Sequence, residues 1–154
     1  MASGPQVGEK APDFSVETTE GRLSLSDLLQ SGKLALTFYV EDGTPLCSSQ
    51  VAAFKQDYAA LEETGARLLA VSADTPESHR AFVERLGGLP FPLASDSDLS
   101  LARAYGVVDE DNKRSRRAVF VIDRDGTVLR RIDFYNPSNS SQYLEIFRAL
   151  GVEG

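Results

Sequence analysis

Cys47 is the only cysteine of the chain, and it directly follows Thr44-Pro45-Leu46 at a point where a strand-like run gives way to a helical pattern. A sulfur at a helix N-terminus lies at the positive end of the helix dipole and beside free backbone N–H groups, which together favour the thiolate. The thiolate is the nucleophilic form of cysteine. The position therefore predicts a reactive thiol, whereas a cysteine without this context is typically an inert core residue.

A thiolate can reduce a hydroperoxide by attacking one oxygen while the other leaves, which produces a sulfenic acid. Charge develops on the leaving oxygen, so the site needs hydrogen-bond donors. The candidates are the backbone N–H groups of Leu46 and Cys47, the hydroxyl of Thr44, and a cation. Arg117 is the candidate cation because it opens a strand-like run and shares its side of the pleat with Val119. This chemistry requires no metal and no organic cofactor.

The same residues also have structural interpretations. Thr44 and Pro45 fit a helix N-cap and a first-turn proline. Arg117 belongs to a basic cluster, which is typical of a solvated loop. His79 is interpreted as a surface or internally hydrogen-bonded histidine rather than a base. Asp96 and the acidic residues that follow it are expected to face solvent.

Strand-like and helix-like segments alternate along the chain, which indicates an α/β fold. Residues 34–40 and 68–72 are short apolar runs typical of strands that are covered on both faces. Apolar residues between them recur at spacings of three and four up to Gly65, so we predict a βαβ unit with parallel strands. The sequence further predicts helices from Thr75 to Gly87-Gly88, over 99–105 and over 142–150, and an antiparallel hairpin of 118–123 with 127–133.

Length and composition narrow the possible classes of protein. The 154 residues contain no linker or repeat, so we predict a single domain over residues 1–154. One cysteine excludes an internal disulfide, and one histidine leaves too few ligands for a structural zinc site, so a reducing cytoplasm is the expected setting. A net charge of −7 disfavours nucleic acid and anionic membranes as partners. With no leader-like or membrane-spanning segment, a soluble, unprocessed protein is expected.

Four segments of the chain resemble the peroxiredoxins, the alkyl hydroperoxide reductase/thiol-specific antioxidant superfamily. Residues 38–47 are similar to the active-site loop of that family, in which a threonine lies three residues before the peroxide-reactive cysteine. Residues 8–14 resemble its N-terminal signature, 71–74 the strand end after the first crossover, and 117–123 the strand that carries its active-site arginine. The spacing is most similar to the bacterioferritin comigratory protein branch. The resemblance implies a thioredoxin-like α/β fold, with a central mixed sheet flanked by helices and an N-terminal extension.

The chain departs from the pattern of that family at three positions. Val40 stands where the loop usually begins with proline, Ala52 where many relatives in the branch have a resolving cysteine, and Gln50 where the branch often has glutamate. The proline of the family shields the thiol, so Val40, Pro45 and Gln50 are expected to shape the pocket. Without a second cysteine, oxidised sulfur can form a disulfide only with an external thiol.

The resemblance implies a one-cysteine, thiol-dependent peroxidase that reduces hydrogen peroxide and organic hydroperoxides. Cys47 would be the nucleophile, and Thr44, Leu46 and Arg117 would bind the substrate with it. The external reductant is expected to be thioredoxin, glutaredoxin or a low-molecular-weight thiol, and the protein a monomer or homodimer. Two alternatives stay open: a redox sensor or thiol switch of the same fold, favoured by Val40, and a binding relative in which Cys47 is unreactive.

Overall fold

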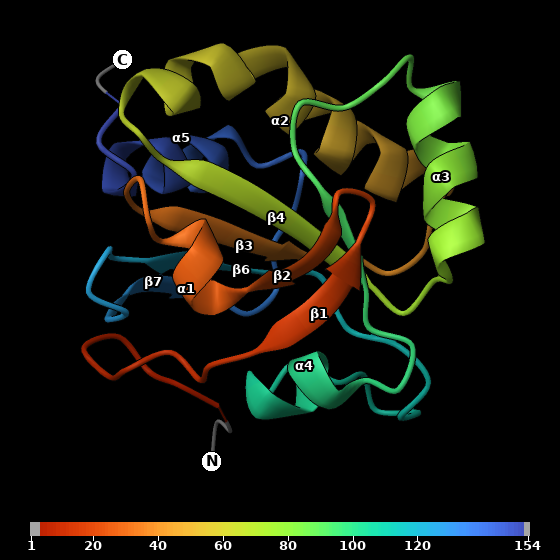
Figure 1. The fold of residues 1–154 in the computed structure, drawn as a ribbon, viewed down its shortest axis with the longest axis horizontal. Coiled ribbons are helices and arrows are strands. Elements are labelled where there is room, and N and C mark those ends of the chain that lie inside the picture. The colour runs from red at the N-terminus through yellow and green to blue at the C-terminus, as the bar shows by residue number, and fades with distance from the viewer. Residues whose placement is uncertain (1–3, 153–154) are drawn as a thin grey trace.

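The computed structural model describes residues 4–152, which form one seven-stranded sheet flanked by helices (Figure 1). The order of strands in the sheet is β2-β1-β5-β4-β3-β6-β7. The elements are β1 (Ser15–Thr18), β2 (Gly21–Ser24), α1 (Leu25–Leu28), β3 (Leu34–Phe38), α2 (Pro45–Glu63), β4 (Arg67–Ser72), α3 (Pro76–Arg85), β5 (Leu93–Ser95), α4 (Ser100–Ala104), β6 (Ala118–Ile122), β7 (Val128–Ile132) and α5 (Ser140–Ala149).

The centre of the sheet is the predicted βαβ unit, in which β3 and β4 run parallel and α2 connects them. All five residues of β3 and all five of β6 are buried, as expected for apolar strands covered on both faces. Strands β6 and β7 form the predicted antiparallel hairpin, and β6 also pairs antiparallel with β3. The mixed, thioredoxin-like sheet expected from the sequence is therefore confirmed.

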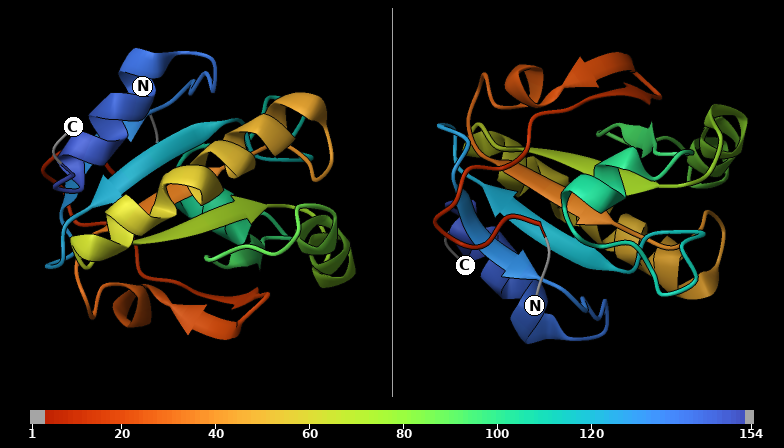
Figure 2. Two further views of the ribbon diagram at one scale, coloured as in Figure 1. Left: turned by 90° about the horizontal axis from the view of Figure 1, so that it is seen from above. Right: turned by 90° about the horizontal axis from the view of Figure 1, so that it is seen from below.

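Helices cover both faces of this sheet (Figure 2). Apolar side chains of α2, α3 and α5 pack with one set of sheet residues, and those of α1 and α4 pack with the other. Because side chains alternate across a strand, neighbouring residues of β6 join different clusters. Val119 and Val121 lie on the α2 face, and Phe120 and Ile122 lie on the opposite face.

The ends of α2 follow the expected local chemistry. The helix ends at Glu63, Thr64 is its C-cap residue, and Gly65 then adopts a left-handed conformation with φ +82°. A Cβ atom at Gly65 would lie 2.6 Å from the carbonyl oxygen of Ser31, so glycine is required there for packing as well as for conformation. None of the helices described over residues 4–152 combines the length and the apolar character needed to cross a membrane.

The structure corrects several sequence predictions. The strand predicted over 34–40 ends at Phe38, so Val40 lies in a loop. The helix predicted over 99–105 spans Ser100–Ala104, because Leu99 has a left-handed φ of 62°. The elements β1, β2, α1 and β5 were not predicted; they are three or four residues long, and the first two form a partly exposed, polar hairpin at the sheet edge.

Candidate functional site

Cys47 lies in the first turn of α2, directly after the loop that follows β3. Thr44 is the N-cap residue with an extended backbone, and Pro45 occupies the first helical position. The first backbone bond of the helix runs from Ser48 N–H to the Thr44 carbonyl, at 2.8 Å. The N–H groups of Leu46 and Cys47 therefore precede the intrahelical ladder, as required for donors to a bound anion.

The Cys47 sulfur is enclosed by protein, with an exposed fraction of 0%. It belongs to the apolar cluster between α2 and the sheet. The Arg117 guanidinium donates a hydrogen bond from Nη2 to Cys47 Sγ at 3.3 Å. The first turn of α2 and the adjacent guanidinium therefore place positive potential and hydrogen-bond donors at the sulfur. The structure thus joins the predicted nucleophile and the predicted cation, which lie 70 residues apart in the sequence.

Arg117 immediately precedes β6, and the segment around it is hydrogen-bonded to two other parts of the chain. Its carbonyl accepts a hydrogen bond from Tyr135 N–H at 2.9 Å, and the hydroxyl of the nearby Ser115 donates to the Tyr39 carbonyl at 3.0 Å. Within residues 4–152, the buried Nε atom of Arg117 has no hydrogen-bond partner. The guanidinium therefore retains a donor in addition to the one that contacts the sulfur.

Thr44, Leu46 and Val40, which the sequence also predicts for the site, are close to Cys47 in the sequence and make different contacts. The Thr44 hydroxyl donates to the Glu41 carbonyl at 3.2 Å and makes no side-chain cap, so the N-cap interpretation holds for its backbone alone. Leu46 is 45% exposed beside the buried thiol. Val40 is half-buried and packs against the apolar cluster that contains Cys47.

Gln50 lies one turn after Cys47 and is buried. Its Nε2 donates to the Thr37 hydroxyl at 2.7 Å and to the Phe38 carbonyl at 3.4 Å. Its Oε1 is buried and, over the described residues, has no partner. The side chain therefore ties α2 to β3 and leaves one acceptor oxygen unused.

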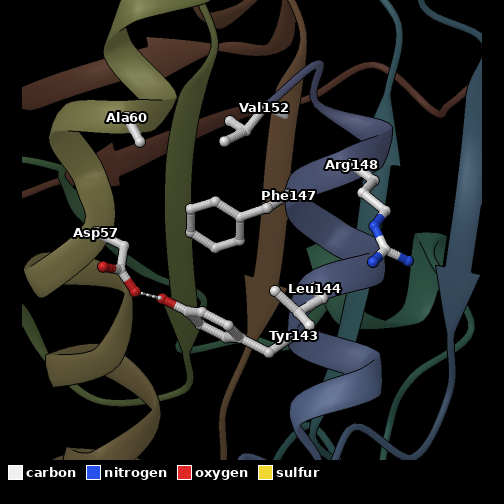
Figure 3. Close-up of a pocket in the computed structure, with 7 residues that line it drawn as sticks. All are labelled: Asp57, Ala60, Tyr143, Leu144, Phe147, Arg148 and Val152. Atoms are coloured by element: carbon white, nitrogen blue, oxygen red, sulfur yellow. Dashed lines mark hydrogen bonds between the residues drawn. The ribbon is translucent and has the colours of Figure 1, made fainter. Parts of the chain in front are cut away.

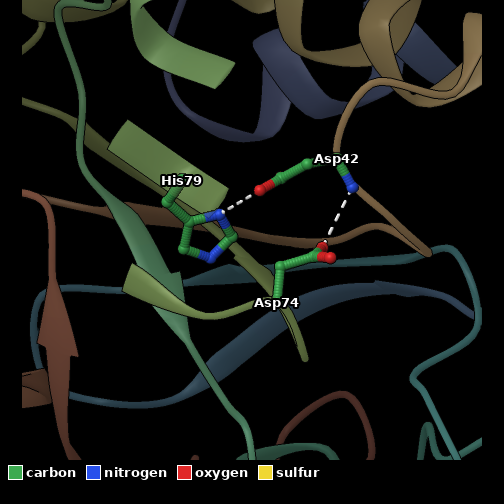
Figure 4. Close-up of side chains that lie close together, drawn as sticks. All are labelled: Asp42, Asp74 and His79. Atoms are coloured by element: carbon green, nitrogen blue, oxygen red, sulfur yellow. Dashed lines mark hydrogen bonds and ion pairs between the residues drawn. The ribbon is translucent and has the colours of Figure 1, made fainter. Parts of the chain in front are cut away.

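A polar cluster that the sequence did not reveal joins Asp42 of the loop before α2 to His79 and Asp74 (Figure 4). His79 of α3 is fully buried, so the internally hydrogen-bonded interpretation of this residue is the right one. Its Nδ1 lies 2.7 Å from Asp42 Oδ2 and its Nε2 lies 2.9 Å from the Ala94 carbonyl oxygen. Asp74 adds a carboxylate, with ligand-type atoms of all three side chains within 4.8 Å of one another. Both ring nitrogens face oxygen acceptors, so the cluster is a hydrogen-bonded network rather than a set of free metal ligands.

A second feature outside the predicted site is a hollow of about 330 Å³ between α2 and α5 (Figure 3). Phe147 and Val152 line it, and Tyr143 donates a hydrogen bond to Asp57 Oδ2 at 2.6 Å beside it. Burial and the neighbouring Asp57 carboxylate raise the pKa of Tyr143, so this phenol stays protonated. Cys47 is not among the residues that line the hollow.

A cysteine in the first turn of the helix after a central strand, with an arginine on its sulfur, defines a thioredoxin-like thiol protein. The AhpC/TSA family matches residues 7–131. The chain is 36% identical to peroxiredoxin 2 of Caldanaerobacter subterraneus over 95% of this chain and 68% of that protein. It is 33% identical to the peroxiredoxin bcp of Coxiella burnetii, over 80% of this chain and 85% of the relative. The crystal structure of peroxidoxin BcpB from Mycobacterium tuberculosis superposes with a TM-score of 0.86 at 26% identity, over 97% of this chain and 99% of that one.

The chain therefore belongs to the AhpC/TSA family, the peroxiredoxins, and it is a thiol-dependent peroxidase. Its single cysteine fits the one-cysteine type. The resemblance inferred from four short segments is confirmed at the level of family, fold and enzyme class.

Proposed function

We propose that Cys47 is the peroxide-reactive residue and that the enzyme works by a one-cysteine cycle. The observation that carries the proposal is the 3.3 Å hydrogen bond from Arg117 to a sulfur at the start of α2. Thr44 and the N–H groups of Leu46 and Cys47 complete the proposed binding site for the two peroxide oxygens. Val40, Pro45 and Gln50 shape its walls.

In the proposed first step, the Cys47 thiolate attacks the terminal oxygen of a hydroperoxide ROOH. An S–O bond forms, the O–O bond breaks, and RO⁻ leaves and takes up a proton, so the sulfur is oxidised by two electrons to Cys-SOH and the peroxide is reduced to ROH. Negative charge moves from the sulfur to the departing oxygen. The Arg117 Nε–H, which has no partner within residues 4–152, and the Thr44 hydroxyl are donors that can form hydrogen bonds to this oxygen as its charge develops.

In the proposed second step, an external thiol R′SH attacks the sulfenic acid, releasing water and forming a mixed disulfide. A second thiol then attacks this disulfide, giving R′SSR′ and free Cys47. The substrates are proposed to be hydrogen peroxide and organic hydroperoxides, and the reductant a thioredoxin, a glutaredoxin or a low-molecular-weight thiol. A reducing compartment such as the cytoplasm suits an enzyme that depends on such thiols.

Turnover is expected to depend on the concentration of an added thiol. Hydrogen peroxide without thiol should oxidise Cys47 once, and excess peroxide should then convert the sulfenic acid to sulfinic acid and inactivate the enzyme. Intact-protein mass spectrometry after one and after ten equivalents of peroxide measures both products. Turnover of many equivalents with no thiol present would contradict the one-cysteine cycle.

Ala52→Cys extends this test. Ala52 is exposed on the outer side of α2 whereas Cys47 is buried on its inner side, so a disulfide between the two positions requires local unwinding of the helix. We expect the variant to lose two hydrogens after one equivalent of peroxide and to resist overoxidation. Ala59→Cys, at another exposed position further along α2, is the matched control and should keep the wild-type response.

A redox sensor is the second candidate function, because Cys47 is fully buried and Val40 replaces the usual proline. Val40 N–H has no hydrogen-bond partner among the described residues, so Val40→Pro removes no bond and should leave the fold intact. We expect the peroxide rate constant to change by less than about threefold, since proline here stiffens the loop without adding a donor. A gain of several orders of magnitude, measured by quenched-flow mass spectrometry, would favour the sensor.

A further inference from the structure

The loop between β3 and α2 is anchored by the polar cluster beneath it. Asp42 lies five residues before Cys47, and its side chain is 2% exposed. Its carboxylate accepts hydrogen bonds from the Tyr39 and Ser78 hydroxyls, the latter at 2.8 Å, and contacts His79 Nδ1 at 2.7 Å. Its backbone N–H donates to Asp74 Oδ2 at 2.9 Å. The loop is thereby fixed to α3 and to the segment after β4, and the Tyr39 bond links its two halves.

The contacts of His79 determine its charge. Nε2 faces a carbonyl oxygen, which only accepts, so this nitrogen carries a proton. Nδ1 lies 2.7 Å from the Asp42 carboxylate, which also accepts when ionised, and 3.3 Å from the Tyr39 hydroxyl, whose proton is donated to Asp42. Burial acts to raise the pKa of Asp42, but the hydrogen bonds from His79 and Tyr39 outweigh it and hold this pKa below its ordinary value. Both ring nitrogens then donate, and the two side chains form a buried ion pair.

We propose that the Asp42–His79 ion pair positions the reactive loop, so that both are positioning residues of the peroxidase reaction. The inference rests on the proposed role of Cys47. The chain between the ion pair and the sulfur is short: Asp42, the left-handed Gly43, the N-cap Thr44 and the first turn of α2. Any shift of Asp42 therefore moves the N–H groups and the hydroxyl that would hold the peroxide.

The enclosure of Cys47 gives the ion pair a second consequence. The sulfur has no exposed surface, so part of the protein must move before peroxide or the reducing thiol can reach it. The loop that leads into α2 is the segment next to the sulfur in the chain. An anchor under that loop limits how far it opens. Loss of the ion pair should therefore make the sulfur easier to reach and, at the same time, worse at peroxide reduction.

The test uses Asp42→Asn, His79→Gln and the double variant of the full chain. Each single change should slow oxidation of Cys47 by hydrogen peroxide about tenfold, since small misplacements of reacting groups have effects of this order or larger. The rate constant of the double variant should also be no more than about tenfold below that of the wild type, because the effects of two residues that act as one pair do not add. A double variant slowed about a hundredfold would show independent effects and would overturn the proposal. Single variants that react at the wild-type rate would overturn it as well.

Asp96→Asn is the matched control. Asp96 is also a buried carboxylate, 3% exposed, but it caps α4 through the N–H groups of Leu101 and Ala102 on the opposite face of the sheet. It should lower the thermal unfolding midpoint without changing the peroxide rate. If it slows oxidation as much as Asp42→Asn does, the effect is loss of stability and not positioning.

Three measurements are independent of peroxidase activity. Hydrogen exchange of residues 40–48 and alkylation of Cys47 by iodoacetamide should both be faster in Asp42→Asn and His79→Gln, and unchanged in Asp96→Asn. His79 is the only histidine, so its ring ¹⁵N signals are assigned without ambiguity and should show two protonated nitrogens at neutral pH. A neutral ring would overturn the ion pair. If the wild-type protein has no peroxidase activity but the exchange, alkylation and ¹⁵N results are as expected, the proposed function is wrong and the anchoring of the loop by the ion pair stands.

Discussion

Replacement of Cys47 by serine is expected to reduce peroxide consumption to the uncatalysed background when dithiothreitol is the reductant. A serine hydroxyl is not ionised near neutral pH, so the nucleophile is lost. Consumption of hydrogen peroxide over time measures the effect. Ser49→Ala, an exposed position two residues further along α2, should retain the wild-type rate.

Because Cys47 is fully buried, a serine hydroxyl there also risks lowering stability. Cys47→Ala avoids a buried hydroxyl and should be equally inactive, with circular dichroism as the check that both variants are folded. Wild-type activity in either folded variant would show that another residue reacts with peroxide, and the proposed role of Cys47 would be wrong.

Arg117→Ala is expected to slow oxidation of Cys47 by about two orders of magnitude, the effect of removing one main donor to a developing charge. The variant loses the bond to Sγ and the spare Nε donor together. Quenched-flow mass spectrometry of the sulfenic acid gives the rate constant. Arg117→Lys keeps the positive charge but loses the planar guanidinium, so its rate constant should lie between those of the wild type and Arg117→Ala.

Two neighbouring arginines provide the controls for this prediction. Arg116 is committed elsewhere, because it pairs with Asp133 at 2.8 Å and lies over the Phe134 ring at 5.0 Å. Arg114 makes no ion pair among the described residues. Arg116→Ala and Arg114→Ala should change the peroxide rate constant by less than about twofold, because within residues 4–152 the guanidinium bonded to Cys47 Sγ is that of Arg117. If the peroxide rate constant falls equally in all three variants, the effect comes from the combined positive charge of the basic loop and not from Arg117 itself.

The sequence alone determined the features that depend on near neighbours along the chain. The change from an apolar strand to a helix placed Cys47 in a first turn, because Pro45 and the spacing of apolar residues are local signals. The alternation of a strand placed Arg117 on the face of Val119 and Val121. The family and its fold followed from short segments of this kind. The single domain over residues 1–154 stays a prediction.

The contact between Arg117 and Cys47 depends on the tertiary structure. The register of β3 against β6 pairs Phe38 with Ala118, which brings the residues after one strand beside those before the other and so joins Arg117 to Cys47. The sequence shows alternation within a strand but not its register against a partner strand.

The buried charges depended on tertiary structure still more. Asp42 and His79 are 37 residues apart, and neither has a local pattern that distinguishes a buried ion pair from a solvated surface. Asp96, expected at the surface, is buried because it caps α4. A charged side chain enters the interior only where partners replace its water, and those partners are assembled by the fold.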